Sequence, residues 1–298
     1  MSSSLHNQKR ILVLGGSGFL GGNLRQIFFN NPNIFFVHSN FNLDRSPKDF
    51  FVSSYDKKSI QNLIINLRID VVLNCVGLTD VDACELNPNL NIRLNLDLPV
   101  MLDNICRKTE TNLVQISTDH YASDTQIPRG EDVVMIPVNN YGLIKLQADN
   151  ALLLNPSTLV VRTNFFGFNP SPREKLFDWA KERLELGQTI DGFSDVFFSP
   201  ISVTLLGTIL MRLIDLGETG LIHAVGGESL SKFNFLQILC KALACDSDQV
   251  QPSSIKNSLL RTSRPNYLSL SNSRMKSLMP EYKEISLSSM IRQELMRF

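Results

Sequence analysis

The stretch ILVLGGSGFLG, residues 11–21, joins a short apolar run to glycines in a G-x-x-G-x-x-G spacing. The apolar run predicts a buried strand, and the residues after the glycines predict a helix. In such a turn Gly15 permits the tight bend, Gly18 lets the backbone approach a pyrophosphate, and Gly21 lets the helix pack closely on the strand. The candidate phosphate-binding residues are therefore Gly15, Ser17, Gly18, Phe19 and Leu20.

Apolar runs alternate with helix-like segments through the first half of the chain. Further strands are predicted at residues 34–37, 70–76, 113–117 and 159–162, and helices at 59–67, 90–106 and 140–154. Continuous apolar strands between amphipathic helices predict a parallel sheet covered on both faces. The expected fold class is α/β, a doubly wound parallel sheet of the Rossmann type.

The pattern changes after about Asn164. Loop-rich stretches at 170–172 and 187–200 separate predicted helices at 176–186, 203–216 and 232–244, with a strand at 220–225 between the last two. We therefore expect a dinucleotide-binding domain over residues 1–163. Residues 164–298 should form a smaller, mainly helical substrate-binding lobe that closes one side of a cleft, with some exchange of chain between the two.

Composition excludes several classes of protein. Lys plus Arg equals Asp plus Glu at 29 each, and no basic run is present, which argues against a nucleic-acid partner. The five cysteines form no C-x-x-C pair, so a reducing, cytoplasmic compartment is expected. No apolar stretch approaches the ~20 residues of a membrane span. Asp80, Asp82 and Glu85 lie within one helix turn, and we interpret them as a solvated helix start and predict no metal.

The end of the second predicted strand bears on the choice of cofactor. It reads Val37-His38-Ser39-Asn40, without the acid that usually binds the adenosine ribose of NAD. Asp44 and Arg45 follow in the loop. Because the missing acid removes repulsion against a 2′-phosphate, NADP(H) is favoured, with NAD(H) as the alternative. His38, Ser39 and Arg45 either contact that phosphate or are ordinary loop residues.

Tyr141 and Lys145 are the candidate proton-transfer pair. Their spacing of four places them on one helical face. A free tyrosine has a pKa of about 10, and an adjacent ammonium favours the phenolate. Thr118 ends a predicted strand, where ligand clefts form in such sheets. The spacing alone is also typical of a tyrosine packed on a surface lysine, but its place after the phosphate loop and Thr118 favours an active site.

Taken together, these motifs resemble the extended short-chain dehydrogenase/reductase family, and within it the dTDP-4-dehydrorhamnose reductase branch. The resemblance covers roughly Arg10 to Leu270. It rests on GGSGFLG from Gly15, DVVLNCVGLTDVDACE over 70–85, the helix with Asn95, QISTDH from Gln115, YGLIK from Tyr141, VRTNFFG from Val160, FFSPIS from Phe197, GLIHAVGGESLSKFNF over 220–235 and TSRPNYLSLSNSRM from Thr262.

The resemblance implies a role for each matching residue. Tyr141 would be the general acid, Lys145 would tune it and bind the nicotinamide ribose, and Thr118 would orient a ketone. Cofactor contacts would also come from Asp56 near the adenine and from Cys75, Val76 and Gly77. Substrate contacts would come from Thr79, Val81, His120, Asn164, Phe165 and Arg264, the last with the substrate's phosphates.

Departures from the branch fall around the sugar pocket. His120 stands where the branch usually has Tyr, Phe165 where it commonly has Trp, and the run from Asp124 to Asp132 also differs. His120 could be a second proton donor, as an epimerising relative would need, or a hydrogen-bonded pocket residue, which we favour.

The expected function is NAD(P)H-dependent reduction of a 4-keto nucleotide-linked deoxysugar, with the nucleotide sugar as partner. A homodimer is one assembly that the resemblance allows. Two alternatives stay open: a nucleotide-sugar epimerase or dehydratase with tightly bound NAD, and a cofactor-binding regulatory subunit without catalysis, as in the related β subunit of methionine adenosyltransferase.

Overall fold

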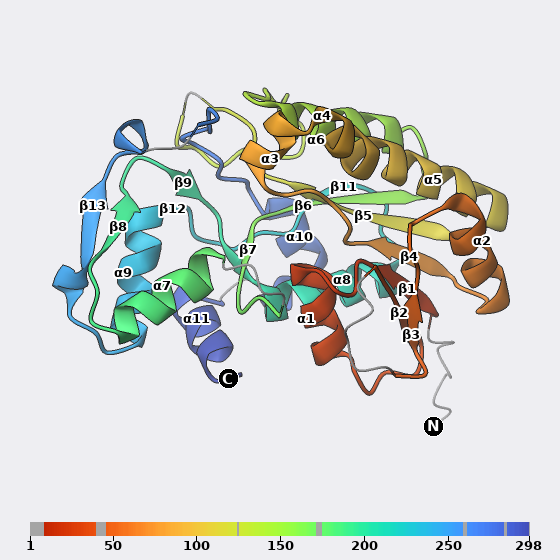
Figure 1. Cartoon of the computed structure of the whole chain (residues 1–298), viewed down its shortest axis with the longest axis horizontal. Coiled ribbons are helices and arrows are strands. Elements are labelled where there is room, and N and C mark those ends of the chain that lie inside the picture. The colour runs from red at the N-terminus through yellow and green to blue at the C-terminus, as the bar shows by residue number, and fades with distance from the viewer. Residues whose placement is uncertain are drawn as a thin grey trace.

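A computed structural model describes residues 9–39, 46–123, 125–170, 175–258, 261–282 and 285–297 (Figure 1). Within these residues, seven strands form one parallel sheet, which confirms the predicted doubly wound α/β fold. From one edge to the other, the strands are β3 (Asp49–Phe51), β2 (Ile34–His38), β1 (Ile11–Leu14), β4 (Val71–Asn74), β5 (Asn112–Thr118), β6 (Thr158–Thr163) and β11 (Gly220–His223).

Alternate residues of each strand face opposite helical layers. Val13 and Leu73 belong to a core shared with α1 (Phe19–Ile27) and α8 (Val203–Leu216). Leu12 and Val72 belong to a second core, shared with α2 (Lys57–Asn66), α5 (Leu98–Thr109) and α6 (Asn140–Leu152). Figure 1 shows α5 and α6 above the sheet and α1 and α8 below it. Burial on both faces explains why these strands are continuously apolar.

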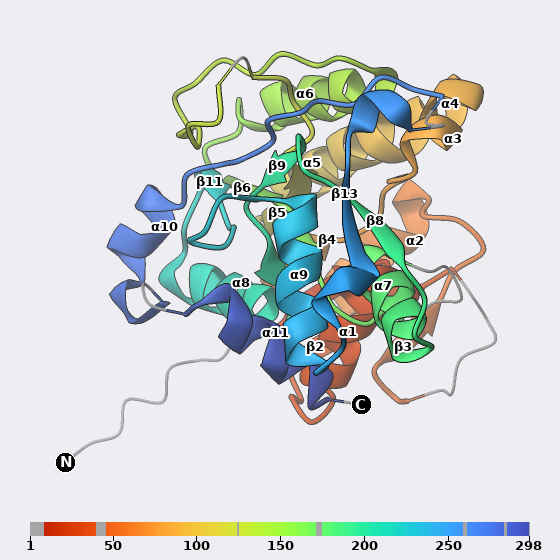
Figure 2. The ribbon, with the colours of Figure 1, turned by 90° about the vertical axis from the view of Figure 1, so that its left-hand side faces the viewer.

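The second part of the chain lies beside this sheet (Figures 1 and 2). Its helices are α7 (Leu176–Glu185), α9 (Lys232–Ala242), α10 (Ser273–Leu278) and α11 (Leu287–Leu295). Its strands form short two-stranded sheets: β7 (Phe165–Phe166) with β10 (Ile201–Ser202), β8 (Ile190–Phe193) with β13 (Val250–Ser253), and β9 (Phe197–Phe198) with β12 (Leu230–Ser231). Single 3-10 turns, η2 (Ser247–Gln249), η3 (Ile255–Asn257) and η4 (Pro280–Tyr282), complete it.

Two elements from the second half of the chain lie with the main sheet and its helical layers. Strand β11 pairs in parallel with β6 and becomes an edge of the sheet, and α8 packs against α1. Local sequence pattern predicts that a strand forms at 220–225 but does not specify its partner, because strand pairing depends on tertiary contacts.

The helix predicted at 90–106 is interrupted. It consists of α4 (Pro88–Ile92), a π-helical segment η1 (Arg93–Asp97) and α5, and it follows the short helix α3 (Val81–Leu86). The buried Asn95 sits in the π segment, where its amide donates to Leu78 O and Asn91 Oδ1 and accepts from Leu78 N. Single-turn π segments often occur at functional sites, and here the segment binds the loop that follows β4.

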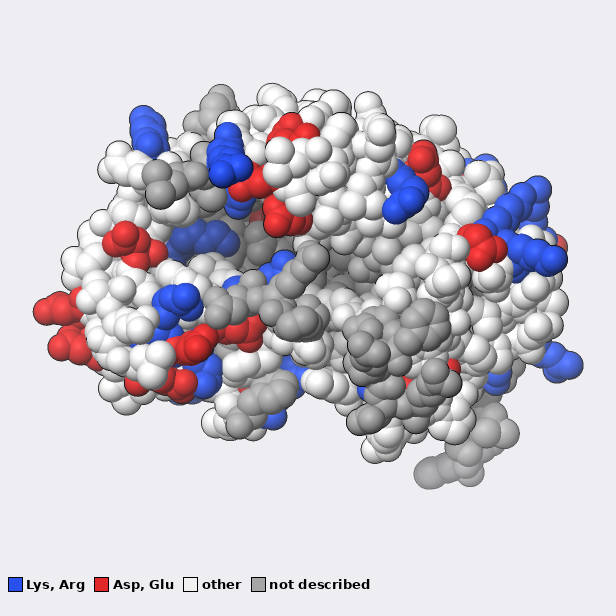
Figure 3. Space-filling model, viewed as in Figure 1, with Lys and Arg blue, Asp and Glu red and all other residues white. Residues whose placement is uncertain are grey.

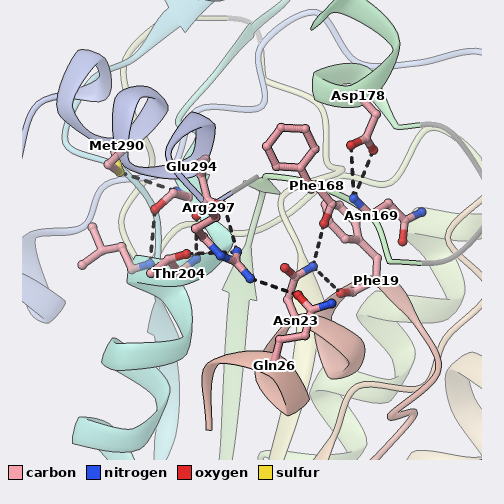
Figure 4. A network of polar contacts seen from close by, with 12 residues as sticks. Phe19, Asn23, Gln26, Phe168, Asn169, Asp178, Thr204, Met290, Glu294 and Arg297 are labelled. Atoms are coloured by element: carbon pink, nitrogen blue, oxygen red, sulfur yellow. Dashed lines mark hydrogen bonds and ion pairs between the residues drawn. The ribbon is translucent and has the colours of Figure 1, made fainter. Parts of the chain in front are cut away.

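Polar contacts also tie α1 to the second part of the chain (Figure 4). Asn23 Nδ2 donates to Phe168 O at 2.8 Å, and the guanidinium of Arg297 reaches Gln26 Oε1 at 3.3 Å. The amide of Asn169 donates to the Asp178 carboxylate, with both distances 3.2 Å. Helix α1, which begins at the glycine loop, is thereby joined to the chain after β7 and to the residue Arg297 that follows α11.

Candidate active site

A cleft of about 1240 Å³ opens at the carboxyl ends of the parallel strands, between the sheet and the second part of the chain. Figure 3, which views the molecule from the same side as Figure 1, shows a hollow near the middle of the molecule. The catalytic, cofactor and substrate residues implied by the resemblance line the cleft, as do those of the glycine loop: Gly15, Ser17, Gly18, Phe19, Leu20, Asp56, Cys75, Val76, Gly77, Thr79, Val81, Thr118, His120, Tyr141, Lys145, Asn164, Phe165 and Arg264. Residues from strands far apart in sequence therefore meet at one surface, as expected of a doubly wound sheet.

The glycine loop has the close approaches that its spacing predicts. Gly15 adopts φ +85°, and its carbonyl accepts from Gly18 N at 2.9 Å. A Cβ on Gly21 would stand 2.2 Å from Gly15 O, so only glycine lets α1 start this close to the loop. Helix α1 has no side-chain cap at Gly18. Its first amides therefore face the cleft as donors suited to an anion.

His38 lies beneath the glycine loop and does not line the cleft. It is fully buried, and its Nε2 is 2.9 Å from Asp49 Oδ1. Arg25 also binds this carboxylate, at 2.6 Å. A Cβ on Gly16 would meet the His38 ring at 2.5 Å. Both alternatives given for His38, a phosphate contact and an ordinary loop residue, are wrong, since it ends strand β2 and Asp49, eleven residues further on, holds the imidazole inside the protein.

The neighbouring end of the cleft, where the resemblance places the adenosine of the cofactor, is lined by Ser39, Tyr55 and Asp56. Asp56 caps α2, where its Oδ1 accepts from Ser59 N at 3.0 Å, and this backbone hydrogen bond lowers the pKa of the exposed carboxyl. Asp49 is unavailable to a ligand because Arg25 and His38 occupy it. Asp44 and Arg45, named above for cofactor choice, lie outside the described residues.

Tyr141, Lys145 and Thr118 meet in the inner part of the cleft. Burial raises the pKa of Tyr141, and a hydrogen bond with the Thr118 hydroxyl opposes that rise. Lys145 Nζ donates to Ile116 O at 2.8 Å. Burial lowers the pKa of this ammonium, whereas the charge of Asp149 raises it. The sequence led us to expect that an adjacent ammonium would favour the phenolate, but burial dominates and keeps the phenol protonated at neutral pH.

Asp119 is a cleft residue absent from the predicted set. Its Oδ2 accepts from Asn164 Nδ2 at 2.6 Å. Burial raises the pKa of this carboxyl to about 6, against the lowering effect of Asn164 and of Lys232. The run Ser117-Thr118-Asp119 at the end of β5 was the available signal, because consecutive residues at a strand end share the cleft edge.

The acids at the start of α3 each have a structural partner. Asp80 caps the helix through Ala83 N at 3.0 Å, and Glu85 accepts from Asn140 N at 2.7 Å. Asp82 accepts from Thr262 N at 3.2 Å and pairs with Arg264 at 3.4 Å. Asp82 and Glu85 thus bind other segments instead of forming only a solvated helix start. Within the described ranges, no group of three or more metal-ligating side chains is found.

Comparison with known proteins identifies the family. The RmlD substrate binding domain family matches residues 9–294, nearly the whole chain. The chain belongs to this family. It is similar to the dTDP-4-dehydrorhamnose reductase of Mycolicibacterium smegmatis, with 30% identity over 74% of this chain and 67% of that protein. It is also similar to the methionine adenosyltransferase 2 subunit beta of Bos taurus, with 25% identity over 91% of this chain and 82% of that protein.

Solved structures share the fold of this chain even at low sequence identity. The dTDP-4-dehydrorhamnose reductase of Bacillus anthracis, solved in complex with NADP, superposes with a TM-score of 0.85 at 20% identity, over 98% of this chain and 100% of that one. The shared fold therefore includes both the parallel sheet and the second part of the chain. Among the residues that the structure describes, no helix is both long and apolar enough to cross a membrane.

Proposed function

We propose that the chain is an NADPH-dependent reductase that converts the ketone of a 4-keto nucleotide-linked deoxysugar to an alcohol. The observation that carries the proposal is the meeting of Tyr141, Thr118 and Lys145 in one cleft with the glycine loop. The similarity to dTDP-4-dehydrorhamnose reductases, at 30% identity, supports the substrate class. The cleft volume of about 1240 Å³ exceeds the ~300–1,000 Å³ of a typical ligand pocket, and so leaves room for a dinucleotide and a nucleotide sugar together.

The residues around the cleft suit a nicotinamide dinucleotide, which supplies the hydride when bound. The free amides at the start of α1 would hold its pyrophosphate, and the buried Asn95 and the π segment position the loop from Cys75 to Thr79 beside it. In the described residues at the adenosine end, the one buried acid, Asp49, is already paired. We therefore propose NADPH as the preferred cofactor.

The proton chemistry follows from the burial of Tyr141. Thr118 and Tyr141 would both donate hydrogen bonds to the ketone oxygen, and the phenol would release its proton to the alkoxide as negative charge develops there. Because burial raises the pKa of Tyr141, the proton is in place before the reaction. Lys145, held at Ile116 O, would stabilise the phenolate that remains. Remote binding of the nucleotide would position the sugar.

A second candidate is a regulatory subunit that binds the cofactor without catalysis. The similarity to methionine adenosyltransferase 2 subunit beta over 91% of this chain favours it. Epimerisation or dehydration is less well supported, because His120, the candidate second proton donor, has a pKa lowered by burial to about 4 and is neutral at physiological pH.

Absorbance of NADPH tests the proposal. Purified protein should oxidise NADPH when dTDP-4-dehydrorhamnose is added and not in its absence. Tight NADPH binding with no oxidation would support the regulatory candidate, and transient oxidation of the sugar with no net loss of cofactor would support the epimerase or dehydratase.

Fluorescence titration with NADPH and NADH tests the cofactor preference separately. NADPH should bind about tenfold or more tightly than NADH, as one charge-assisted contact would provide. Tighter binding of NADH would show the proposed preference to be wrong.

A further inference from the structure

His120 occupies an unusual position in the cleft. Its ring lies edge-on to the ring of Tyr141, with the centroids 5.6 Å apart. Its backbone amide donates to Thr118 Oγ1 at 3.2 Å, so the hydroxyl proton of Thr118 stays available for another acceptor. The imidazole therefore stands beside both side chains proposed to contact the ketone oxygen.

Asn139 determines which ring nitrogen of His120 carries the proton. The amide oxygen of Asn139 accepts from Gly142 N at 2.9 Å and caps α6. Its amide nitrogen donates to Ser263 O at 2.9 Å. A backbone N–H can only donate and a carbonyl can only accept, so these two bonds fix the orientation of the amide. The remaining N–H of Asn139 points at His120 Nε2, 3.0 Å away.

It follows that Nε2 is an acceptor and that the neutral ring carries its hydrogen on Nδ1. Burial, together with the charges of Arg264 and Lys232, lowers the pKa of His120 to about 4, so this neutral form prevails at physiological pH. Within the described residues, Nδ1 has no hydrogen-bond partner. His38 Nδ1 and His223 Nε2 also lack a partner, but they are fully buried. His120 Nδ1 is not, so solvent in the cleft reaches it.

We propose that His120 is a specificity-determining residue whose Nδ1–H donates a hydrogen bond to an oxygen on the carbon next to the ketone. This inference rests on the proposed function and narrows its substrate class to sugars with a hydroxyl adjacent to the ketone. The proposed function assigns the ketone oxygen to Tyr141 and Thr118. The His120 ring, with its centroid 5.6 Å from that of Tyr141 in the same cleft, would then contact a group on the neighbouring carbon. A neutral Nδ1–H donates a hydrogen bond without transferring its proton, so His120 acts in recognition.

Kinetics with two sugars tests the contact. The probes are dTDP-4-dehydrorhamnose and its 3-deoxy counterpart, which lacks the hydroxyl next to the ketone. The wild type should prefer the hydroxylated sugar by about 10- to 100-fold in kcat/KM, because a sugar without that hydroxyl leaves the Nδ1–H of His120 unpaired. His120→Phe keeps an aromatic ring against Tyr141 and should reduce this ratio to about threefold or less. His120→Asn can place an amide nitrogen where Nδ1 lies and should retain most of the preference.

Three outcomes separate the claims. Equal losses on both sugars in His120→Phe, or no preference in the wild type, would overturn the recognition role while leaving the reductase proposal intact. No turnover of either sugar by the wild type would overturn both. Fluorescence titration of NADPH should be the same in all these proteins, which shows that a variant has kept its fold and its cofactor site.

Nitrogen NMR tests the tautomer without any substrate. The chain has four histidines, and the signal of His120 is the one that disappears in His120→Phe. Its Nδ1 should be protonated and its Nε2 unprotonated. In Asn139→Asp the carboxylate can still cap Gly142 N, but it accepts from Nε2–H, so at pH 8 the tautomer should invert and the preference between the sugars should fall as in His120→Phe. An Nε2–H tautomer in the wild type would overturn the proposal.

Discussion

Tyr141 shows how the setting of one side chain alters the chemistry expected from its spacing. Because it lies four residues from Lys145, we expected the adjacent ammonium to favour the phenolate form of Tyr141. In the folded protein burial raises the pKa of Tyr141 and Lys145 donates to Ile116 O. The pair is thus suited to release a proton from the phenol to a developing alkoxide, and not to remove one from a substrate.

The first prediction concerns this phenol. Tyr141→Phe removes the hydroxyl and keeps the ring packed against Cys84 and Val81. We expect kcat to fall about 10²- to 10⁴-fold, the range of general acid catalysis. Affinity for NADPH in a fluorescence titration should change by less than about threefold. Activity close to that of the wild type would mean that another group supplies the proton.

Single residues also mark the limit of inference from the sequence. The cleft residues follow from motif position, because the ends of parallel strands must share one edge. His38 also stands at such an end, yet it is buried. Its partner Asp49 comes from β3, and Arg25, which binds the same carboxylate, comes from α1. Nothing near His38 in sequence indicates that these residues meet there. Asn139 is similar, since its contact with Ser263 joins residues 124 apart in the chain.

At the scale of elements, a buried ion pair joins α6, the helix of Tyr141, to strand β6. Arg162 Nε lies 2.9 Å from Asp149 Oδ2, with side-chain exposures of 4% and 1%. The Tyr121 hydroxyl also reaches this carboxylate, and the guanidinium of Arg162 lies over the Tyr121 ring. Removing one charge would leave the other buried and unpaired, so this contact is far more costly to break than an exposed pair.

The second prediction compares the two kinds of pair. Asp149→Asn keeps the side-chain volume and should lower the free energy of unfolding by about 3 kcal/mol or more. Glu185→Ala removes an exposed pair with Lys181 on α7, where the expected change is about 0.5 kcal/mol or less. Urea denaturation of the three proteins gives these values. Similar losses in both variants would contradict the assignment of Asp149 as a buried counter-charge.

Elements differ in how far their sequences specify them. Strands β1, β4, β5 and β6 were predictable because burial on both faces demands apolar runs. Strand β11 has the same local pattern, but its place beside β6 depends on α8 returning the chain to that edge. The π segment was not predictable either, because it depends on the contacts of Asn95 with Leu78, seventeen residues away.

For the whole molecule, histidines enclosed in the core link folding to pH. Burial lowers the pKa of His38 and lowers that of His223 to about 4, where the charge of Arg162 adds to the effect. His223 on β11 is fully buried, and its ring faces Ser271 O. The ordinary pKa of 6.5 applies in the unfolded chain. Between pH 6.5 and 4 the unfolded state therefore binds more protons, so stability falls as the pH falls.

The third prediction isolates the contribution of His223 to the loss of stability at acidic pH. Acidification from pH 7.5 to 4.5 should cost roughly 2 to 3 kcal/mol through this residue, given a folded pKa of about 4 and an unfolded pKa of 6.5. His223→Asn can keep a donor toward Ser271 O but does not titrate. The variant's loss of unfolding free energy over this pH range should thus be smaller than that of the wild type by about that amount. Urea denaturation at both pH values measures each loss, and the comparison within one protein cancels any change in packing. If wild type and variant lose the same free energy, His223 does not contribute to acid sensitivity.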